Sequence, residues 1–145
     1  RKLKIEFIDV ENEIEKEQGM KISKIFETKG EDYFRKIEEN ITLKILKKNN
    51  KVISLGGGAF LNQNINQEIR KHHISFWLNW DNKTLIDRIN NSKKRPVAFR
   101  ASKNQLIDLI KKRTKIYSKA LYKIDCENLS KIEIADKILK IYETH

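Results

Sequence analysis

The stretch VISLGGG (residues 52–58) predicts a short strand that runs directly into three consecutive glycines. The chain has only five glycines. Because three together cost backbone entropy, this position must need either bare backbone or positive φ. The N–H groups of Gly56, Gly57 and Gly58 can close on a ligand oxygen where any β-carbon would collide. The alternative is an ordinary flexible turn. The run lacks the GxGxxG spacing of a dinucleotide-binding loop.

Around this stretch, short apolar runs alternate with helical patterns, which indicates βαβ units and a parallel sheet. The apolar spacing predicts strands at residues 4–9, 52–55, 74–78 (a buried strand) and 122–126, and helices at 13–26 with a turn at Gly19, 31–48, 62–72, 83–90, 103–118 and 130–143. Asp81 can cap the helix that follows it. We therefore expect one α/β domain over residues 1–145, with a loop at about 91–102 that holds the only proline.

The composition fits a soluble globular protein, with 39% hydrophobic and 35% charged residues. No run of 18 apolar residues and no signal-peptide pattern is present, so no membrane association is expected. The single cysteine, Cys126, excludes an internal disulfide and reads as a small buried apolar side chain. We expect a cytoplasmic protein.

The formal net charge is +11, but its 24 lysines and 7 arginines are spread along every segment. This distribution indicates a compositional bias rather than a basic face. Since no RNA-binding motif or zinc finger is present, no nucleic-acid partner is expected. The positive field can still attract anionic substrates.

Two carboxylates, Asp9 and Glu11, follow the first predicted strand. The carboxyl end of a strand faces the ligand crevice in an open α/β sheet. If the strand continues through both residues, their side chains share one side. Such carboxylates can hold Mg²⁺ through water and orient an acceptor hydroxyl. The alternative is a solvated acidic loop.

Further along the chain, Arg35 and Glu38 are three residues apart on the helix at 31–48, so they meet on one face. The carboxylate can hold the guanidinium for a bidentate contact with a substrate carboxylate. A surface ion pair is the alternative. The basic loop that contains Arg95 can close over phosphates, and Arg113 and Tyr117 lie on the next helix. A solvated loop is the alternative there.

Taken together and in this order, these motifs resemble shikimate kinase over essentially the whole chain. The residues that carry the resemblance are Phe7-Ile8-Asp9-Val10-Glu11, Ile14-Glu15, Gly19, Ile22, Ile25-Phe26, Gly30-Glu31, Phe34-Arg35, Glu38, Gly56-Gly57-Gly58, Arg95-Pro96, Arg113 and Tyr117. The resemblance implies a three-layer P-loop kinase-type fold with a parallel sheet, acting as a monomer on shikimate and ATP with Mg²⁺. The γ-phosphoryl group of ATP would move to the 3-hydroxyl of shikimate.

The resemblance also implies a role for each site residue. Asp9 matches the aspartate that helps to hold Mg²⁺, and Glu11 the acidic residue that meets the ring hydroxyls, where a base would act. Arg35 and Arg113 match the arginines that bind the shikimate carboxylate. Arg95 matches the loop arginine that reaches the ATP phosphates and acts in catalysis. Gly56, Gly57 and Gly58 match the substrate-binding glycines, the last two as backbone donors.

The chain departs from the family pattern in two ways. Glutamate stands at position 11 where the family has aspartate, and no G-x-x-x-x-G-K-[ST] motif is present. We expect that the first strand, the P-loop and most of the first helix are missing, that the missing strand is the central one of five, and that the 145 residues alone are inactive. A related kinase for another hydroxy acid such as gluconate, or a non-catalytic shikimate-type binding domain, are the alternatives.

Overall fold

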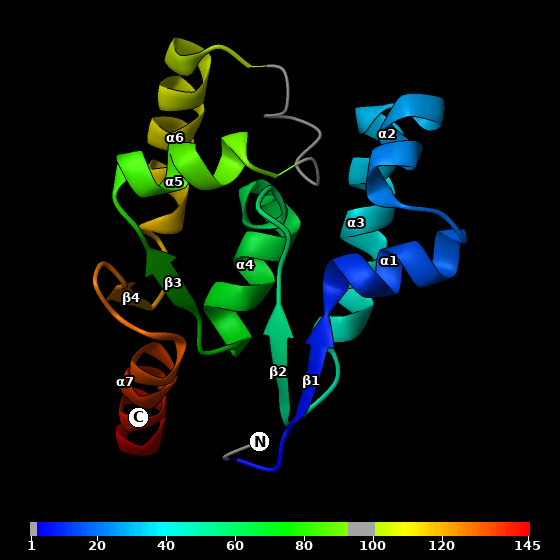
Figure 1. Cartoon of the computed structure of the whole chain (residues 1–145). Coiled ribbons are helices and arrows are strands. Elements are labelled where there is room, and N and C mark those ends of the chain that lie inside the picture. Colours follow the sequence, from blue (N-terminus) through cyan, green and yellow to red (C-terminus); the bar gives the residue numbers. More distant parts are fainter. Residues whose placement is uncertain (1–2, 93–100) are drawn as a thin grey trace.

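The computed structural model describes residues 3–92 and 101–145, which form an α/β fold (Figure 1). The elements in chain order are β1 (Glu6–Asp9), α1 (Val10–Gln18), α2 (Ile22–Lys29), α3 (Glu31–Leu46), β2 (Lys51–Ser54), the short 3₁₀ helix η1 (Ala59–Leu61), α4 (Gln63–His72), β3 (Phe76–Asn79), α5 (Asn82–Asn90), α6 (Lys103–Tyr117), β4 (Tyr122–Asp125) and α7 (Lys131–Thr144).

Every predicted strand and helix is present, with ends that differ by at most three residues. The predicted helical segment 13–26 is divided into α1 and α2 by Gly19, whose φ of 65° lies in the left-handed region that glycine tolerates best. Helices α5 and α6 leave residues 91–102 between them, as expected for the loop. Residues 93–100 of that loop lie outside the described residues.

Side-chain caps fix where several helices begin. The Asp81 carboxylate accepts a hydrogen bond from the Thr84 N–H at 2.7 Å, which confirms the predicted cap of α5. Ser102 and Ser130 each form a reciprocal capping box, with Gln105 and Glu133. These caps satisfy backbone donors that the first helical turn leaves unpaired.

The four strands are all parallel to their partners, but they form two separate pairs. Strand β1 pairs with β2, and β3 pairs with β4. Among the described residues no ladder joins β2 to β3, so the predicted parallel strands are confirmed and lie in two separate pairs. Figure 1 shows the two pairs apart.

The core is built from apolar side chains of both halves. The cluster that supports the candidate site joins β1 to α1, α2 and α3, and its buried members are Ile8, Val10, Ile14, Ile25, Phe34, Ile41 and Ile45. Cys126 is fully buried near β4 and α7, as predicted. The prediction that the third strand is buried is wrong, since residues 74–77 are only partly buried and Leu78 is 45% exposed. Phe7 and Val52, which face each other across β1 and β2, are also exposed.

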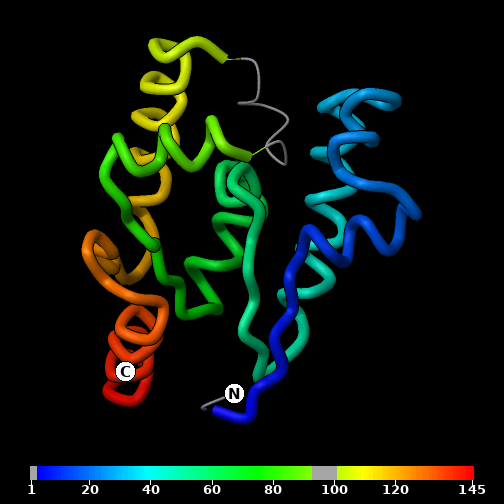
Figure 2. The backbone as a smooth tube through the Cα atoms, viewed as in Figure 1, coloured from blue at the N-terminus to red at the C-terminus, as the bar shows by residue number. Residues whose placement is uncertain are grey.

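The fold brings the end of β2 between two helices. The chain leaves β2, passes through the three glycines and enters η1, which contacts α3 on one side and α6 on the other. Figure 2 shows this turn of the chain between the α2–α3 side and the α5–α6 side. No helix in the described ranges is long and apolar enough to cross a membrane.

Candidate active site

Each of the three glycines lies against a different charged side chain. A β-carbon on Gly56 would stand 2.5 Å from Oε1 of Glu11, and one on Gly57 would stand 2.9 Å from Nη1 of Arg113. A β-carbon on Gly58 would stand 2.6 Å from Nη2 of the Arg35 guanidinium. These are separations that real β-carbons do not adopt. The triplet therefore needs bare backbone, because α1, α3 and α6 each place one charged group against it.

The backbone angles decide between the two reasons that the sequence offered for the glycines. The described glycines with positive φ are Gly19 and Gly30, and Gly58 has a φ of −98°. Positive φ is therefore not the reason for the triplet. The carbonyls of Gly56 and Gly58 accept from the N–H groups of Ala59 and Leu61, each at 3.2 Å, so the segment is an ordered turn rather than a flexible one.

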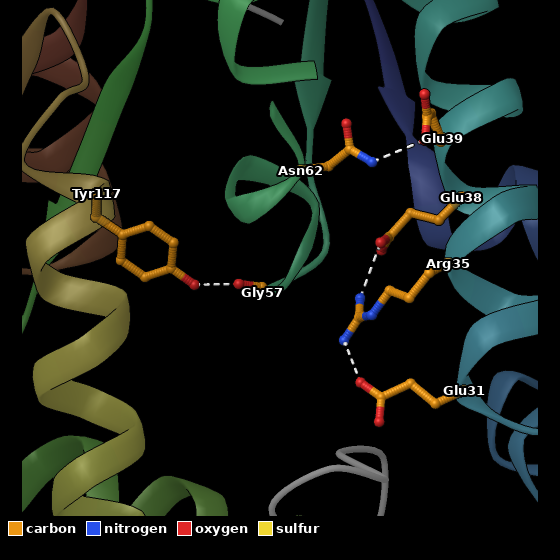
Figure 3. A network of polar contacts seen from close by, with 7 residues as sticks. All are labelled: Glu31, Arg35, Glu38, Glu39, Gly57, Asn62 and Tyr117. Carbon is orange, nitrogen blue, oxygen red and sulfur yellow. Dashed lines mark hydrogen bonds and ion pairs between the residues drawn. The ribbon is translucent and has the colours of Figure 1, made fainter. Parts of the chain in front are cut away.

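Arg35 is held by two carboxylates of its own helix (Figure 3). Its Nη1 donates to Oε1 of Glu38 at 2.8 Å, and its Nη2 lies 3.4 Å from Oε1 of Glu31. The Glu38 side chain is only 3% exposed and the Arg35 side chain 30%. The alternative of a surface ion pair is therefore wrong. A guanidinium held on two sides is oriented before any ligand arrives.

Burial raises the pKa of the Glu38 carboxyl above its ordinary value. The hydrogen bond and the charge of Arg35 act in the opposite direction, and the charge of Arg113 adds to them. A buried carboxylate is costly unless it is paired. The charges of both guanidinium groups thus favour the ionised form of Glu38, with Arg35 on α3 as its hydrogen-bonded partner.

On the opposite side of the triplet, α6 contributes Arg113 and Tyr117. The Tyr117 hydroxyl donates to the carbonyl of Gly57 (Figure 3), and its ring packs on Trp77 with the centroids 6.3 Å apart. The Nε of Arg113 is buried and has no hydrogen-bond partner among the described residues. A buried donor without a partner costs free energy. A ligand oxygen at this position would remove that cost.

The two acidic residues are not on one strand. Strand β1 ends at Asp9, as predicted, and Glu11 lies in the first turn of α1, so the condition for both side chains to share one side of a strand is not met. Asp9 is the N-cap, and its Oδ1 accepts from the N–H groups of Glu11 at 3.0 Å and Asn12 at 3.4 Å. The change from strand to helix turns Glu11 toward Gly56.

One set of contacts was missed at the level of sequence. Oε2 of Glu39 accepts from the Asn62 side chain at 2.9 Å, and its Oε1 accepts from Asn64 at 2.6 Å. The other end of the Asn62 amide caps α4 by accepting from the Ile65 N–H at 3.0 Å. These bonds tie α3 to the segment that follows the glycines (Figure 3). Only the capping preference of Asn62 is a sequence signal; its partner 23 positions away is not.

The structure thus brings together Glu11, Arg35, Gly56, Gly57, Gly58 and Arg113, all of them predicted site residues. Arg95 lies outside the described residues. In the ranges 3–92 and 101–145, no three His, Cys, Asp or Glu side chains gather in a way that could hold a metal ion.

These features define the class of the protein: an α/β protein of parallel strands whose site offers two guanidinium groups and one carboxylate around a bare backbone turn. Two guanidinium groups suit a small carboxylate, and the carboxylate suits hydroxyl groups on the same molecule.

The comparisons with known proteins narrow this class. The family model described as shikimate kinase matches residues 1–143. A shikimate kinase of Thermodesulfovibrio yellowstonii is 37% identical over 144 residues, which cover 99% of this chain and 83% of the relative. The shikimate kinase of Bacillus subtilis is 38% identical, with 97% and 76% covered. The chain belongs to the shikimate kinase family.

Solved structures agree with this assignment. The crystal structure of shikimate kinase from Aquifex aeolicus has a TM-score of 0.84 at 33% identity and covers 99% of this chain and 85% of that one. A shikimate kinase from Acinetobacter baumannii, solved in complex with shikimate, has a TM-score of 0.90 at 28% identity, with 98% and 80% covered. The α/β kinase fold predicted from the sequence is confirmed.

Proposed function

We propose that this protein transfers the γ-phosphoryl group of ATP to the 3-hydroxyl of shikimate. The observation that carries the proposal is the arrangement of Arg35, Arg113 and Glu11 against the three glycines. It matches a ring that has a carboxylate at one end and hydroxyl groups at the other. The family match and the relatives above are named for shikimate, and they give no support to a gluconate-type kinase or to a non-catalytic binder.

In this proposal, the two arginines bind the substrate carboxylate. Arg35 binds it with a guanidinium already oriented by Glu38 and Glu31. The buried Nε of Arg113 gains from it the hydrogen-bond acceptor that it lacks among the described residues. The carbonyls of the triplet accept hydrogen bonds within the protein, so we assign the N–H groups of Gly57 and Gly58 to the ligand. Bidentate contacts from both sides would fix the ring in one orientation.

Glu11 is assigned to the hydroxyl end. Its carboxylate lies on the Gly56 side of the turn, away from the glycine that meets Arg35. There it would accept hydrogen bonds from the ring hydroxyls and take the proton of the attacking hydroxyl. Phosphoryl transfer depends mainly on position and on charge neutralisation rather than on a covalent enzyme intermediate.

Asp9 and Arg95 are assigned to the nucleotide end. Oδ1 of Asp9 caps α1, which leaves Oδ2 to meet a hydrated cation. A single carboxylate fits Mg²⁺, which keeps most of its waters in kinase sites. When bound, the ion would neutralise charge on the phosphates. Arg95 is assigned to the ATP phosphates by resemblance alone. A cytoplasmic location and a monomeric state complete the proposal as predictions from the sequence.

The test is shikimate-dependent phosphoryl transfer by a protein that carries residues 1–145 together with an upstream P-loop segment, since the 145 residues alone are expected to be inactive. ³¹P NMR identifies the phosphorylated position. We expect shikimate 3-phosphate and no reaction with gluconate. Arg35→Ala should reduce the reaction strongly, whereas Arg70→Ala, at an exposed arginine on α4, should not. Equal reaction with gluconate, or an unaffected Arg35→Ala variant, would contradict the proposal.

A further inference from the structure

Glu11 supplies all three of the nearest atoms to the β-carbon position of Gly56. A β-carbon on Gly56 would stand 2.5 Å from Oε1 of Glu11 and 3.3 Å from both Cγ and Cδ. Oε1 therefore lies in the space that an alanine methyl group would fill, and Cγ and Cδ lie in tight contact with it. No other charged side chain is among the nearest atoms at Gly56, whereas Gly57 and Gly58 face arginines.

The backbone does not require glycine at this position. The described glycines with positive φ are Gly19 and Gly30, so no left-handed backbone requires glycine at position 56. Space is the only constraint that the structure shows. Because that space is filled by the end of the Glu11 side chain, the identity of residue 56 and the length of the side chain at position 11 are linked.

The backbone of Glu11 is itself fixed. Its N–H donates to Oδ1 of Asp9 at 3.0 Å in the first turn of α1. The following helix packs into the core through Ile14, which is fully buried. Since the backbone cannot withdraw, the length of the side chain decides how far the carboxylate reaches. Glutamate reaches one methylene further than aspartate, and that extra length ends against Gly56.

We propose that Gly56 and Glu11 are a matched pair, in which the missing side chain of Gly56 makes room for a glutamate at position 11. Gly56 is then a positioning residue: it does not touch the reacting atoms, but it sets where the Glu11 carboxylate meets the hydroxyl end of the substrate. This inference rests on the proposed function. The glycine itself belongs to the family pattern, so what the inference assigns to this chain is the use of the space at Gly56 by a longer carboxylate side chain.

The inference predicts that Gly56→Ala lowers activity but not the stability of the fold. The atoms in the way belong to the end of a flexible side chain, so the fold should tolerate the methyl group and the carboxylate should move instead. A displacement of about 1 Å at a reacting group can cost about a hundredfold in rate. We therefore expect a loss of at least about tenfold in kcat with shikimate and little change in Tm.

The experiment is a double-mutant cycle of Gly56→Ala and Glu11→Asp, measured by kcat and by shikimate affinity. Aspartate is shorter and withdraws the carboxylate from the new methyl group. In the Glu11→Asp background, Gly56→Ala should therefore cost less than about threefold. The matched control is Gly57→Ala, whose methyl group meets Arg113 and whose penalty should be the same in both backgrounds. An equal penalty for Gly56→Ala in both backgrounds would overturn the inference.

A crystal structure of the Gly56→Ala variant separates this inference from the proposed function. The Glu11 carboxylate should be swung away from residue 56, whatever the substrate is. A carboxylate that stays in place beside the new methyl group would overturn the inference even if shikimate is phosphorylated. A wild-type protein that does not phosphorylate shikimate would instead overturn the proposed function. The displaced carboxylate would then still support the matched pair of Gly56 and Glu11.

Discussion

The two arginines that face the glycine turn are held in different ways. Arg35, on α3, is gripped by Glu38 at 2.8 Å and Glu31 at 3.4 Å. Arg113, on α6, has a buried Nε without a partner among the described residues. Both guanidinium groups lie against the same three glycines, at Gly58 and Gly57 respectively.

This difference gives the two arginines different roles in binding a ligand. The α3 side is preorganised, because its guanidinium is fixed by side chains of its own helix. The α6 side is incomplete without a ligand, because a buried donor there lacks an acceptor. The same charge therefore contributes to protein stability on one side of the site and mainly to binding on the other.

Arg35→Ala should have the largest effect. The change removes a substrate anchor and leaves Glu38 as a buried carboxylate without its main partner. Losing one charge-assisted contact costs about 2–5 kcal/mol, so shikimate affinity should fall by well over tenfold. The protein should also lose about 2 kcal/mol of unfolding free energy, less than for a fully buried pair because the Arg35 side chain is 30% exposed. Calorimetric titration and urea unfolding measure the two losses.

Arg35→Lys sharpens this prediction, because an ammonium cannot reproduce the planar fork. It should lose nearly as much affinity for shikimate while ATP affinity changes little. Equal losses for both ligands would show that Arg35 is a structural arginine.

Arg113→Ala should reduce shikimate affinity by well over tenfold and lower stability less than Arg35→Ala does, since its charge is only a minor contribution to the buried Glu38 carboxylate. The change removes a guanidinium whose Nε is unpartnered, so the folded protein loses no hydrogen bond from that atom. The measurements are again titration with shikimate and urea unfolding, with Arg70→Ala as the control. A loss of stability as large as that of Arg35→Ala would remove the difference between the two sides.

The pH dependence tests the link between the sides through Glu38. Its pKa is raised by burial, so on acidification the carboxyl should take up a proton at a higher pH than an ordinary glutamate and release its grip on Arg35. We expect shikimate affinity to fall severalfold through that step. Glu38→Gln should weaken binding mildly and remove this pH dependence.

Stability should change in the opposite direction. A carboxyl whose pKa is raised by folding contributes stability that is present below its unfolded-state pKa and is lost as the pH rises through the folded-state pKa. The free-energy difference between wild type and Glu38→Gln should therefore move in favour of the wild type as the pH falls. A flat difference would contradict the assigned direction of the pKa shift.

Tyr117→Phe should have the smallest effect. It removes the hydrogen bond to the Gly57 carbonyl but keeps the ring contact with Trp77. One hydrogen bond contributes about 0.5–1.5 kcal/mol, so shikimate affinity should fall by about two- to tenfold. Tyr142→Phe, at an exposed tyrosine on α7, is the control and should be silent. Loss of ATP affinity alone would contradict the role of Tyr117 in the glycine turn.

Most of the fold was predictable because its signals are local. Apolar spacing gave the helices and strands, and Asp81 gave a cap, since each depends on neighbours within a few positions. The division of the strands into two pairs was not predictable from β2 or β3 alone. Pairing depends on what stands beside a strand in space, and no local pattern reports it.

The candidate site was predictable by residue type but not by geometry. Glu11 and Gly56 were both identified, yet the expected reason for each was incomplete. Glu11 reaches the site from a helix rather than a strand, because Asp9 caps α1 and ends β1. The glycines are needed because charged side chains from three helices approach them, and such long-range contacts leave no periodic signal.

The central claim is that two guanidinium groups around the glycine turn bind the carboxylate of shikimate. The most direct test is calorimetric titration of the wild-type protein and Arg35→Ala with shikimate and with its methyl ester, which lacks the charge. We predict that the wild type binds the acid at least tenfold more tightly than the ester, and that Arg35→Ala loses most of this preference. Equal affinity of the wild type for acid and ester would contradict the account.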